Sequence, residues 1–290
     1  MTRPAVVVVG DATLDVHVTP AVPLAAGSDV PAEVRLGPGG QGANLAVRLA
    51  RQGVAVTLVC ALADDPAAEM IRAGLDADGV TLVALPVQAT GVIVVIGGAD
   101  GERSMLSDRA PLPAAVADAA AGRGDWLLVS GYVLLQPGAA ELAGRLAALP
   151  TRRVLVGCAV ADEALAAWRA AARELRPDLV VANREEADRA RLAELADALA
   201  VTDAAGAEVR IGVVRTMAAI PPGQPAVDTT GAGDAFAARL VAGLLEAAWP
   251  PEEVRLRAAV EAAVELASAV ARVDGAQTEV PGERPAALRR

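Results

Sequence analysis

The sequence predicts an α/β fold in which a mostly parallel central sheet is covered by helices on both faces. Short runs of β-branched and apolar residues alternate with alanine-rich stretches of helical length along most of the 290 residues. Hydrophobic residues make up 54% and charged residues 21% of the chain, which is typical of a globular protein with a large core. Two stretches break this alternation, and we expect them to form a small second sheet within a single domain spanning residues 1–290.

The first half of the chain begins with a run of valines, which we interpret as the first strand of the central sheet. Gly53 follows an alanine-rich and leucine-rich segment and is the expected end of the first helix. The expected strands here are residues 5–10, 54–61 and 80–85, and the expected helices are residues 43–52 and 66–76.

The second half repeats the strand and helix alternation. Trp249, Pro250 and Pro251 separate the last two helices because proline cannot continue a helix from within. The expected strands are residues 126–130, 153–160 and 179–182, and the expected helices are residues 137–149, 162–175, 184–199, 234–246 and 251–271.

The two exceptional stretches are residues 14–36 and 91–107, whose glycines and prolines indicate hairpins without helices. A turn is expected at Gly97-Gly-Ala-Asp-Gly101. Val92, Val94 and Ile96 alternate on one face of the second stretch, so one alternative for this small sheet is that it pairs with a second copy in a homodimer.

Composition excludes several classes of function. The formal net charge of −10 disfavours nucleic acid and anionic membranes as partners. All 26 basic residues are arginine, which excludes Schiff-base enzymes and phosphate loops that depend on lysine. His17 is the only histidine, so a zinc site built from several histidines is excluded as well.

The cysteines and the lengths of the apolar runs predict the cellular compartment of the protein. Cys60 and Cys158 lie far apart in apolar runs, and we expect two reduced core thiols, as in a reducing cytoplasm. The apolar run at residues 5–9 is too short for a signal peptide, and no later run approaches the roughly 20 residues of a membrane-spanning helix. We therefore expect a soluble, cytoplasmic protein.

A glycine-rich segment, Gly37-Pro-Gly-Gly-Gln-Gly42, has the letter pattern of a dinucleotide-binding loop. That pattern belongs in the turn after the first strand, whereas the turn here holds two carboxylates and no glycine cluster. We therefore disfavour a nicotinamide or flavin site. The segment leads into a helix with Asn44 near its start, whose side chain suits the hydroxyls of a small polar ligand; a tight loop before a helix is the alternative.

The segment Asp228-Thr-Thr-Gly-Ala-Gly-Asp234, directly before a helix, points most clearly to chemistry. Its glycines let the backbone fold closely around a ligand, and the backbone N–H groups of Gly231, Ala232, Gly233 and Asp234 can form an anion hole without lysine. Asp234 can accept a proton from an attacking hydroxyl beside that hole. The alternative is that Asp228 and Asp234 only cap the helix.

These residues resemble the ribokinase-like (PfkB) carbohydrate kinases. The Asp228–Asp234 segment is similar to the carboxy-terminal signature of that family, and Gly39-Gly-Gln-Gly-Ala-Asn44 with Gly53 is similar to the amino-terminal one. The resemblance covers nearly the whole chain and implies a Rossmann-like α/β/α sandwich with a small β-sheet lid, formed by about residues 12–37 and 88–108. It also implies ATP-dependent phosphorylation of a hydroxyl on a small sugar or sugar-like substrate.

The resemblance also implies roles for individual residues. Asp234 would be the catalytic base beside the Gly231, Ala232 and Gly233 anion hole. The residues implied to bind substrate are Asp11, Asp15, Gly39, Gly40 and Asn44, although Asp11 and Asp15 are also explained as turn residues.

The nucleotide and metal sites are implied in the same way. Asn183-Arg-Glu-Glu186 is similar to a family motif associated with Mg²⁺, with Glu186 near the ion, and Asp228 lies where many members bind a monovalent cation such as K⁺. A solvated first turn of a helix equally explains Glu186. Asn183, Thr202, Gly206 and Thr230 are implied to contact the nucleotide.

Some choices stay open at this stage. Thr202-Asp-Ala-Ala-Gly206 departs from the family pattern Thr-x-Gly-x-x-Gly, which leaves the preferred nucleotide undetermined. A nucleoside kinase of the same fold and a catalytically silent sugar-binding regulatory protein are the alternatives to a sugar kinase. Arg109 fits either an acidic substrate group or a solvated lid position. The identity of the sugar, the hydroxyl attacked, the oligomer and any effector cannot be predicted.

Overall fold

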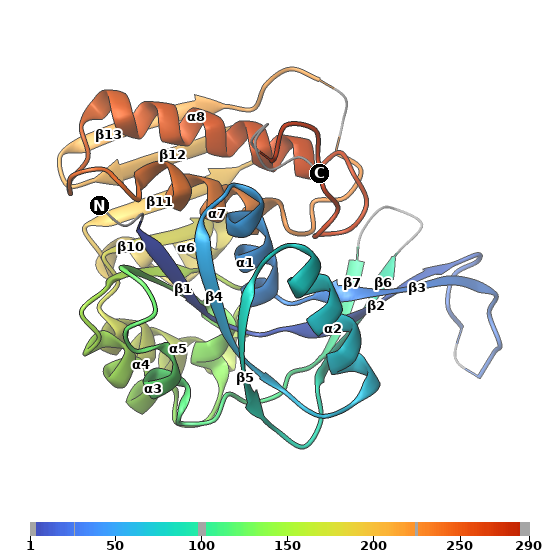
Figure 1. Ribbon diagram of the computed structural model, residues 1–290. Helices are drawn as coiled ribbons and strands as arrows, with labels where there is room; N and C mark the ends of the chain where they lie inside the picture. Colours follow the sequence, from blue (N-terminus) through green and yellow to red (C-terminus); the bar gives the residue numbers. More distant parts are fainter. Residues whose placement is uncertain (1–3, 26, 98–102, 224–225, 285–290) are drawn as a thin grey trace.

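The computed structural model describes residues 4–25, 27–97, 103–223 and 226–284 and contains a nine-stranded central sheet (Figure 1). The strand order is β13-β12-β11-β10-β9-β8-β1-β4-β5. All neighbours from β11 to β5 are parallel, and β12 and β13 extend the sheet as antiparallel strands. The strands are β1 (Ala5–Val9), β4 (Ala55–Leu62), β5 (Thr81–Pro86), β8 (Trp126–Ser130), β9 (Arg152–Val156), β10 (Leu179–Asn183), β11 (Ala198–Asp203), β12 (Gly206–Ile211) and β13 (Val214–Ala219).

Helices cover both faces of this sheet, which confirms the predicted α/β architecture (Figure 1). Alternation along β1 shows why a run of valines suits the centre: Val6 and Val8 are buried in the core on one face, and Val7 and Val9 in the core on the other. The helices are α1 (Gln41–Arg51), α2 (Pro66–Ala77), α3 (Val116–Ala120), α4 (Ala139–Ala147), α5 (Asp162–Leu175), α6 (Arg184–Arg189), α7 (Ala232–Leu244) and α8 (Glu253–Val270).

The two exceptional stretches form a separate four-stranded sheet, as predicted (Figure 1). Its order is β3-β2-β6-β7, with antiparallel hairpins at both edges and a parallel pair in the middle. The turn predicted around Gly97–Gly101 falls mostly at residues 98–102, which lie outside the described residues. The strands are β2 (Thr13–Pro20), β3 (Ala32–Gly39), β6 (Gly91–Gly97) and β7 (Arg103–Asp108).

One face of the small sheet is apolar and largely exposed. The strand register aligns Leu36, Val16, Val94 and Leu106 in one row across the four strands. Leu36 is 56% exposed and Leu106 is 61% exposed. Pairing of this face with a second copy remains a prediction.

The prediction of one long helix over residues 184–199 is wrong. Helix α6 ends at Arg189, a short 3₁₀ turn follows at Leu192–Glu194, and Ala198–Asp203 form β11. The alanine-rich sequence has high helix propensity but no clear apolar period, so pairing of β11 with β10 and β12 decides its structure.

The cysteines are buried and free, as predicted: Cys60 lies in β4, and Cys158 lies two residues after β9, which ends earlier than expected. None of the described helices is both long and apolar enough to span a membrane.

Candidate active site

The candidate site lies beside β1, where the strand order of the central sheet reverses. From β1 the chain adds β4 and β5 on one side, while β8 to β13 lie on the other. Such a switch leaves a crevice at the carboxyl ends of the strands. Asp11 follows β1 there, and the Ser130 hydroxyl at the end of β8 donates a hydrogen bond to Asp11 Oδ1 at 3.2 Å.

The glycines before α1 serve close packing of the backbone. A Cβ on Gly42 would lie 2.7 Å from Gly10 atoms, and Gly40 has φ 91°. This close approach lets Gly42 N donate to Asp11 Oδ1 at 3.3 Å, and Ala43 N donate to the Asp11 carbonyl oxygen at 3.0 Å. Asp11 therefore holds the start of α1 against the end of β1.

A chain of side chains joins the starts of α1 and α7. Asn44 Nδ2 donates to Asp234 Oδ2 at 2.9 Å, and Gln277 Nε2 donates to Asn44 Oδ1 at 3.0 Å. The helix α1 supplies Asn44, and the first turn of α7 supplies Asp234. The structure therefore brings two predicted site residues into direct contact although they are 190 positions apart.

The surroundings of Asp234 suit a proton acceptor. Removal from water raises the pKa of Asp234 to about 7, with the Asn44 hydrogen bond acting in the opposite direction. The nearby carboxylate of Asp11 also raises this pKa, and the charge of Arg48 lowers it. A carboxyl group with a pKa near neutrality can both take and release a proton at physiological pH.

The start of α7 is open to an anion. Gly231 is the N-cap residue in the left-handed region with φ 77°, and no side chain caps the helix. A Cβ at Gly231 would lie 2.8 Å from the Ala276 side chain, so only glycine fits there. The N-cap residue has no side chain to cap α7, and Ala232 N donates to the Thr229 carbonyl oxygen at 3.2 Å. The remaining first-turn N–H groups and the positive end of the helix suit an anion.

Asp228 shapes the loop that precedes α7. Its Oδ1 accepts from Thr230 N at 2.6 Å and its Oδ2 accepts from Gly275 N at 3.0 Å. The side chain is buried, with 3% of the residue exposed. Asp228 thus ties the loop before α7 to the segment that follows α8.

The residues Asn183 and Glu186 form a capping box at the start of α6. Glu186 N donates to Asn183 Oδ1 at 2.8 Å, and Asn183 N donates to Glu186 Oε2 at 3.1 Å. Burial raises the pKa of Glu186. Glu186 is therefore a partly buried capping residue and not part of a solvated first turn, and its ligand role stays a prediction.

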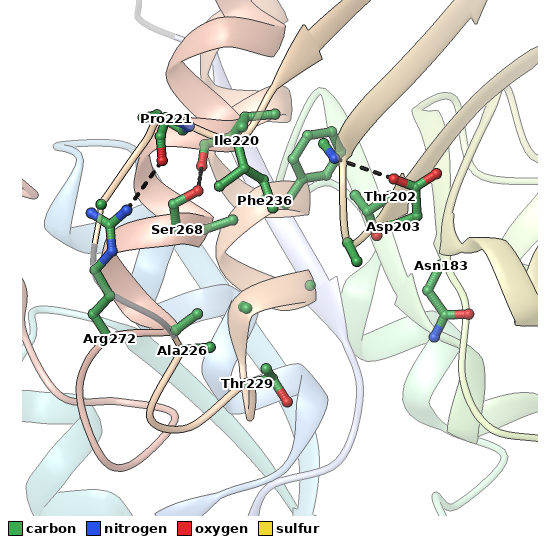
Figure 2. Close-up of a pocket in the computed structure, with 18 of the residues that line it drawn as sticks. Asn183, Thr202, Asp203, Ile220, Pro221, Ala226, Thr229, Phe236, Ser268 and Arg272 are labelled. Atoms are coloured by element: carbon green, nitrogen blue, oxygen red, sulfur yellow. Dashed lines mark hydrogen bonds between the residues drawn. The ribbon is translucent and has the colours of Figure 1, made fainter.

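A pocket of about 830 Å³ opens beside the start of α7 (Figure 2). Thr229, Ala232 and Gly233 line it near the anion site, and Asn183, Thr202 and Gly206 line it from the sheet. Its remaining wall is mainly apolar and includes Ile220, Phe236 and Val264. The volume and lining suit a small organic molecule that carries phosphate.

The hairpin between β11 and β12 forms another edge of this pocket. Asp203 Oδ1 accepts from Ala205 N at 2.9 Å and from Gly206 N at 3.2 Å. A Cβ on Gly206 would lie 2.0 Å from the Ala218 carbonyl oxygen. The shortened Thr202–Gly206 segment thus forms a compact turn, in which only glycine fits at position 206.

Two of the residues predicted to bind substrate, Asp11 and Asp15, line two different cavities, whereas Gly39, Gly40 and Asn44 line neither of them. Asp15 lines one of about 420 Å³ with Gln277, and Asp11 lines one of about 310 Å³ with Tyr132. Gly39 passes so close to Asp15 that a Cβ there would lie 2.0 Å from the carboxylate. Burial raises the pKa of Asp15.

Two further residues belong to the site: Arg109, whose role the sequence left open, and Gln41, which it did not predict. Arg109 forms an ion pair with Asp11, and its guanidinium lies 3.7 Å from the centre of the Tyr132 ring, so it is not a solvated lid residue. Gln41 bridges the strand ends: its Nε2 donates to the Gly157 carbonyl at 2.8 Å, and its Oε1 accepts from Gly131 N at 3.0 Å. No local pattern in the sequence marks these contacts.

Comparisons with known proteins agree with this arrangement. Residues 3–282 match the family model described as pfkB family carbohydrate kinase. No curated protein matches the sequence.

Solved structures similar to this chain include three kinases. Ribokinase from Thermotoga maritima is 19% identical, with a TM-score of 0.77 and 96% of each chain covered. Arabidopsis thaliana ribokinase complexed with ribose and ATP is 20% identical, with a TM-score of 0.75 and 97% of each chain covered. Adenosine kinase from Sinorhizobium meliloti is 23% identical, with a TM-score of 0.73, covering 98% of this chain and 97% of that chain. At these identities the similarities establish the fold.

Proposed function

This chain belongs to the pfkB family of carbohydrate kinases, and from that membership we propose that it transfers the γ-phosphate of ATP to a hydroxyl of a small sugar or sugar-like alcohol. The observation that carries the proposal is the position of Asp234. Its carboxyl group lies in the first turn of α7, beside an uncapped helix start and in contact with Asn44. Base and anion site therefore come from one short segment.

The proposed step needs little covalent participation from the protein. The oxygen of the substrate hydroxyl attacks the γ-phosphorus, the bond from that phosphorus to the β–γ bridging oxygen breaks, and ADP leaves. The hydroxyl proton passes to a carboxylate oxygen of Asp234. Meanwhile the N–H groups of Gly231, Ala232 and Gly233 stabilise the negative charge on the phosphoryl oxygens.

The pocket of about 830 Å³ is the proposed ATP site. Asn183, Thr202 and Gly206 line it and would contact the nucleotide, together with Thr230, which follows the lining residue Thr229. The apolar wall with Phe236 would contact the base. The uncapped start of α7 at the same pocket supports this assignment because it attracts phosphate.

Glu186 and Asp228 could hold Mg²⁺ and a monovalent cation only together with other ligands. No cluster of three His, Cys, Asp or Glu that could hold a metal occurs among the described residues. Glu186 offers one carboxylate, which suits Mg²⁺ held mainly by phosphates and water. Asp228 binds backbone N–H groups through both oxygens, so it would shape a loop whose carbonyls hold K⁺. When bound, Mg²⁺ would neutralise part of the charge on the phosphates.

On the substrate side, Asp11, Asp15, Gly39, Gly40 and Asn44 would bind the sugar hydroxyls. The four-stranded sheet, within residues 12–37 and 88–108, would act as the lid that keeps water from the phosphoryl group. Dimerisation through its apolar face is part of the same proposal. The structure of Arabidopsis ribokinase with ribose and ATP supports a substrate of this class.

The proposal is tested by measuring ADP release from ATP and Mg²⁺ over a panel of pentoses, hexoses, sugar acids and nucleosides. We expect turnover with at least one sugar or sugar alcohol. Turnover with nucleosides alone would favour the nucleoside kinase that the similarity to an adenosine kinase leaves as the second candidate. Sugar binding without any ADP release would contradict catalysis and favour a silent binding protein.

The pH dependence of turnover tests the base assignment. With the pKa of Asp234 raised to about 7, only the ionised carboxylate can accept the proton, so kcat/KM should rise with pH and level off above about pH 7. The measurement is kcat/KM for the best substrate between about pH 5.5 and 9. A rate that stays constant from about pH 5.5 to 8 would contradict the assignment.

A further inference from the structure

One face of α1 carries three polar residues that all point to the segment after α8. Asn44, Arg48 and Arg51 are spaced by four and three positions, which puts them on one side of a helix. All three contact residues between 276 and 283. The helix that carries a proposed site residue therefore also carries the cations that hold this segment.

The two arginines hold the two peptide groups that flank Gln277. Arg48 Nη2 donates to the Ala276 carbonyl oxygen at 2.6 Å, and Arg51 Nη1 donates to the Gln277 carbonyl oxygen at 2.7 Å. The carboxylate of Glu283 pairs with Arg48 at 2.7 Å and lies 3.5 Å from Arg51. The side chains of Arg48 and Glu283 have 0% exposure, so solvent does not compete with these bonds.

The held residue, Gln277, fixes the direction of the Asn44 amide. Its Nε2 donates to Asn44 Oδ1 at 3.0 Å, so in this arrangement the oxygen of Asn44 faces Gln277. The Asn44 amino group then points to Asp234. If the Asn44 amide were reversed, its oxygen would oppose the Asp234 carboxylate and its amino group would oppose that of Gln277.

We propose that Gln277 is a positioning residue, held by Arg48 and Arg51, which orients Asn44 so that its amino group donates to the ionised Asp234. This inference rests on the proposed function for its catalytic meaning. Gln41, whose amide is bonded to Gly157 and Gly131, also lowers the pKa of Asp234 through a side-chain hydrogen bond, and it is unchanged in the variants below.

The charged and titratable groups around Asp234 set its acidity together with Asn44. They are Asp11 after β1, Arg48 on α1 and Tyr132 in the 3₁₀ turn after β8. The variants below leave these three groups unchanged. A shift in the pKa of Asp234 therefore comes from the changed residue 277 and its effect on Asn44.

The test compares Gln277→Met with Gln277→Glu. Methionine removes the donor, so the Asn44 amide is free to turn and its bond to Asp234 weakens. Glutamate has the same shape but can only accept, so it attracts the Asn44 amino group away from Asp234. Gln52→Met is the matched control because Gln52 lies just after α1 and its side-chain amide donates to the Arg48 carbonyl at 2.8 Å.

The direct measurement is an NMR titration of the Asp234 carboxyl carbon in protein with labelled aspartate. The signal of Asp234 is assigned by its absence in Asp234→Asn. We expect its pKa to rise in Gln277→Met, to rise further in Gln277→Glu, and to stay unchanged in Gln52→Met. For the active enzyme we expect kcat to fall about tenfold in Gln277→Met with little change in the KM for ATP.

An Asp234 titration in Gln277→Met that matches the wild type would overturn the proposal, as would an equal change in Gln52→Met. The NMR titration needs no substrate. A wild-type protein without turnover would therefore contradict the proposed function while the role of Gln277 is still decided. If Gln277→Glu does not fold, the apolar variant decides alone.

Discussion

Replacing Asp234 with asparagine is expected to cut turnover by about 10²- to 10⁴-fold, because the substrate hydroxyl loses its proton acceptor. Asparagine keeps the shape of the side chain, and its oxygen can still accept the hydrogen bond from Asn44. ATP binding should therefore change little. The measurement is kcat with the best substrate, together with the Kd for ATP by calorimetry. Turnover within about threefold of the wild type would remove Asp234 as the base.

The same substitution should stabilise the protein above neutral pH. Because the pKa of Asp234 is about 7 in the folded protein and about 3.8 in a free side chain, the folded state holds a proton that the unfolded state has lost between these values. The free energy of unfolding therefore falls as pH rises from about 4 to 7. Asparagine avoids this loss, and we expect a gain on the order of 2 kcal/mol at pH 8.

Urea unfolding at about pH 5 and 8 checks this second effect. Asp76→Asn, which alters an exposed carboxylate on α2, is the control and should show no comparable gain. An Asp234→Asn protein that is less stable than the wild type at pH 8 would show that the carboxylate is not under strain in the fold.

The second large effect is expected at Glu283. Replacing it with glutamine leaves the fully buried Arg48 without its charge partner and should lower the free energy of unfolding by about 3 to 5 kcal/mol. The position of Arg48 worsens the loss, since its Nε already lacks a hydrogen-bond partner among the described residues. Urea unfolding measures the change.

Two further variants serve as controls for the Glu283→Gln measurement. Glu279→Gln removes an exposed carboxylate that pairs with Arg284 and should change stability by less than about 1 kcal/mol. Arg48→Met combined with Glu283→Met removes both buried charges and should recover most of the stability that the single change loses. A single Glu283→Gln variant as stable as the wild type would contradict the assignment of a tightly coupled pair.

The sequence predicts elements well where local pattern and packing agree. The valines of β1 are buried on both faces, and the predicted helix over residues 162–175 coincides with α5. The prediction fails at residues 184–199, where alanine favours a helix while strand pairing requires β11. The antiparallel strands β12 and β13 were not predicted at all, because their stability comes from a neighbour already in the sheet.

The candidate site divides in the same way. Asp234 and the glycines before it could be found because helix start, glycine and acid lie within seven consecutive residues. Gln277 could not be found, because its partner Asn44 lies 233 positions away and neither residue is unusual in its own neighbourhood. The pairing of Arg48 with Glu283 spans 235 positions and is equally invisible in the sequence.

These long separations set an order of events during synthesis. A ribosome that has made the first 270 residues has delivered every strand of both sheets and the start of α7, yet neither Gln277 nor Glu283. A nascent chain at that stage can form its central sheet before Gln277 is present to bond the amide of Asn44 and before Glu283 is present to pair with the charge of Arg48. Premature termination close to the end would therefore leave a protein that is both less stable and less active than the complete chain.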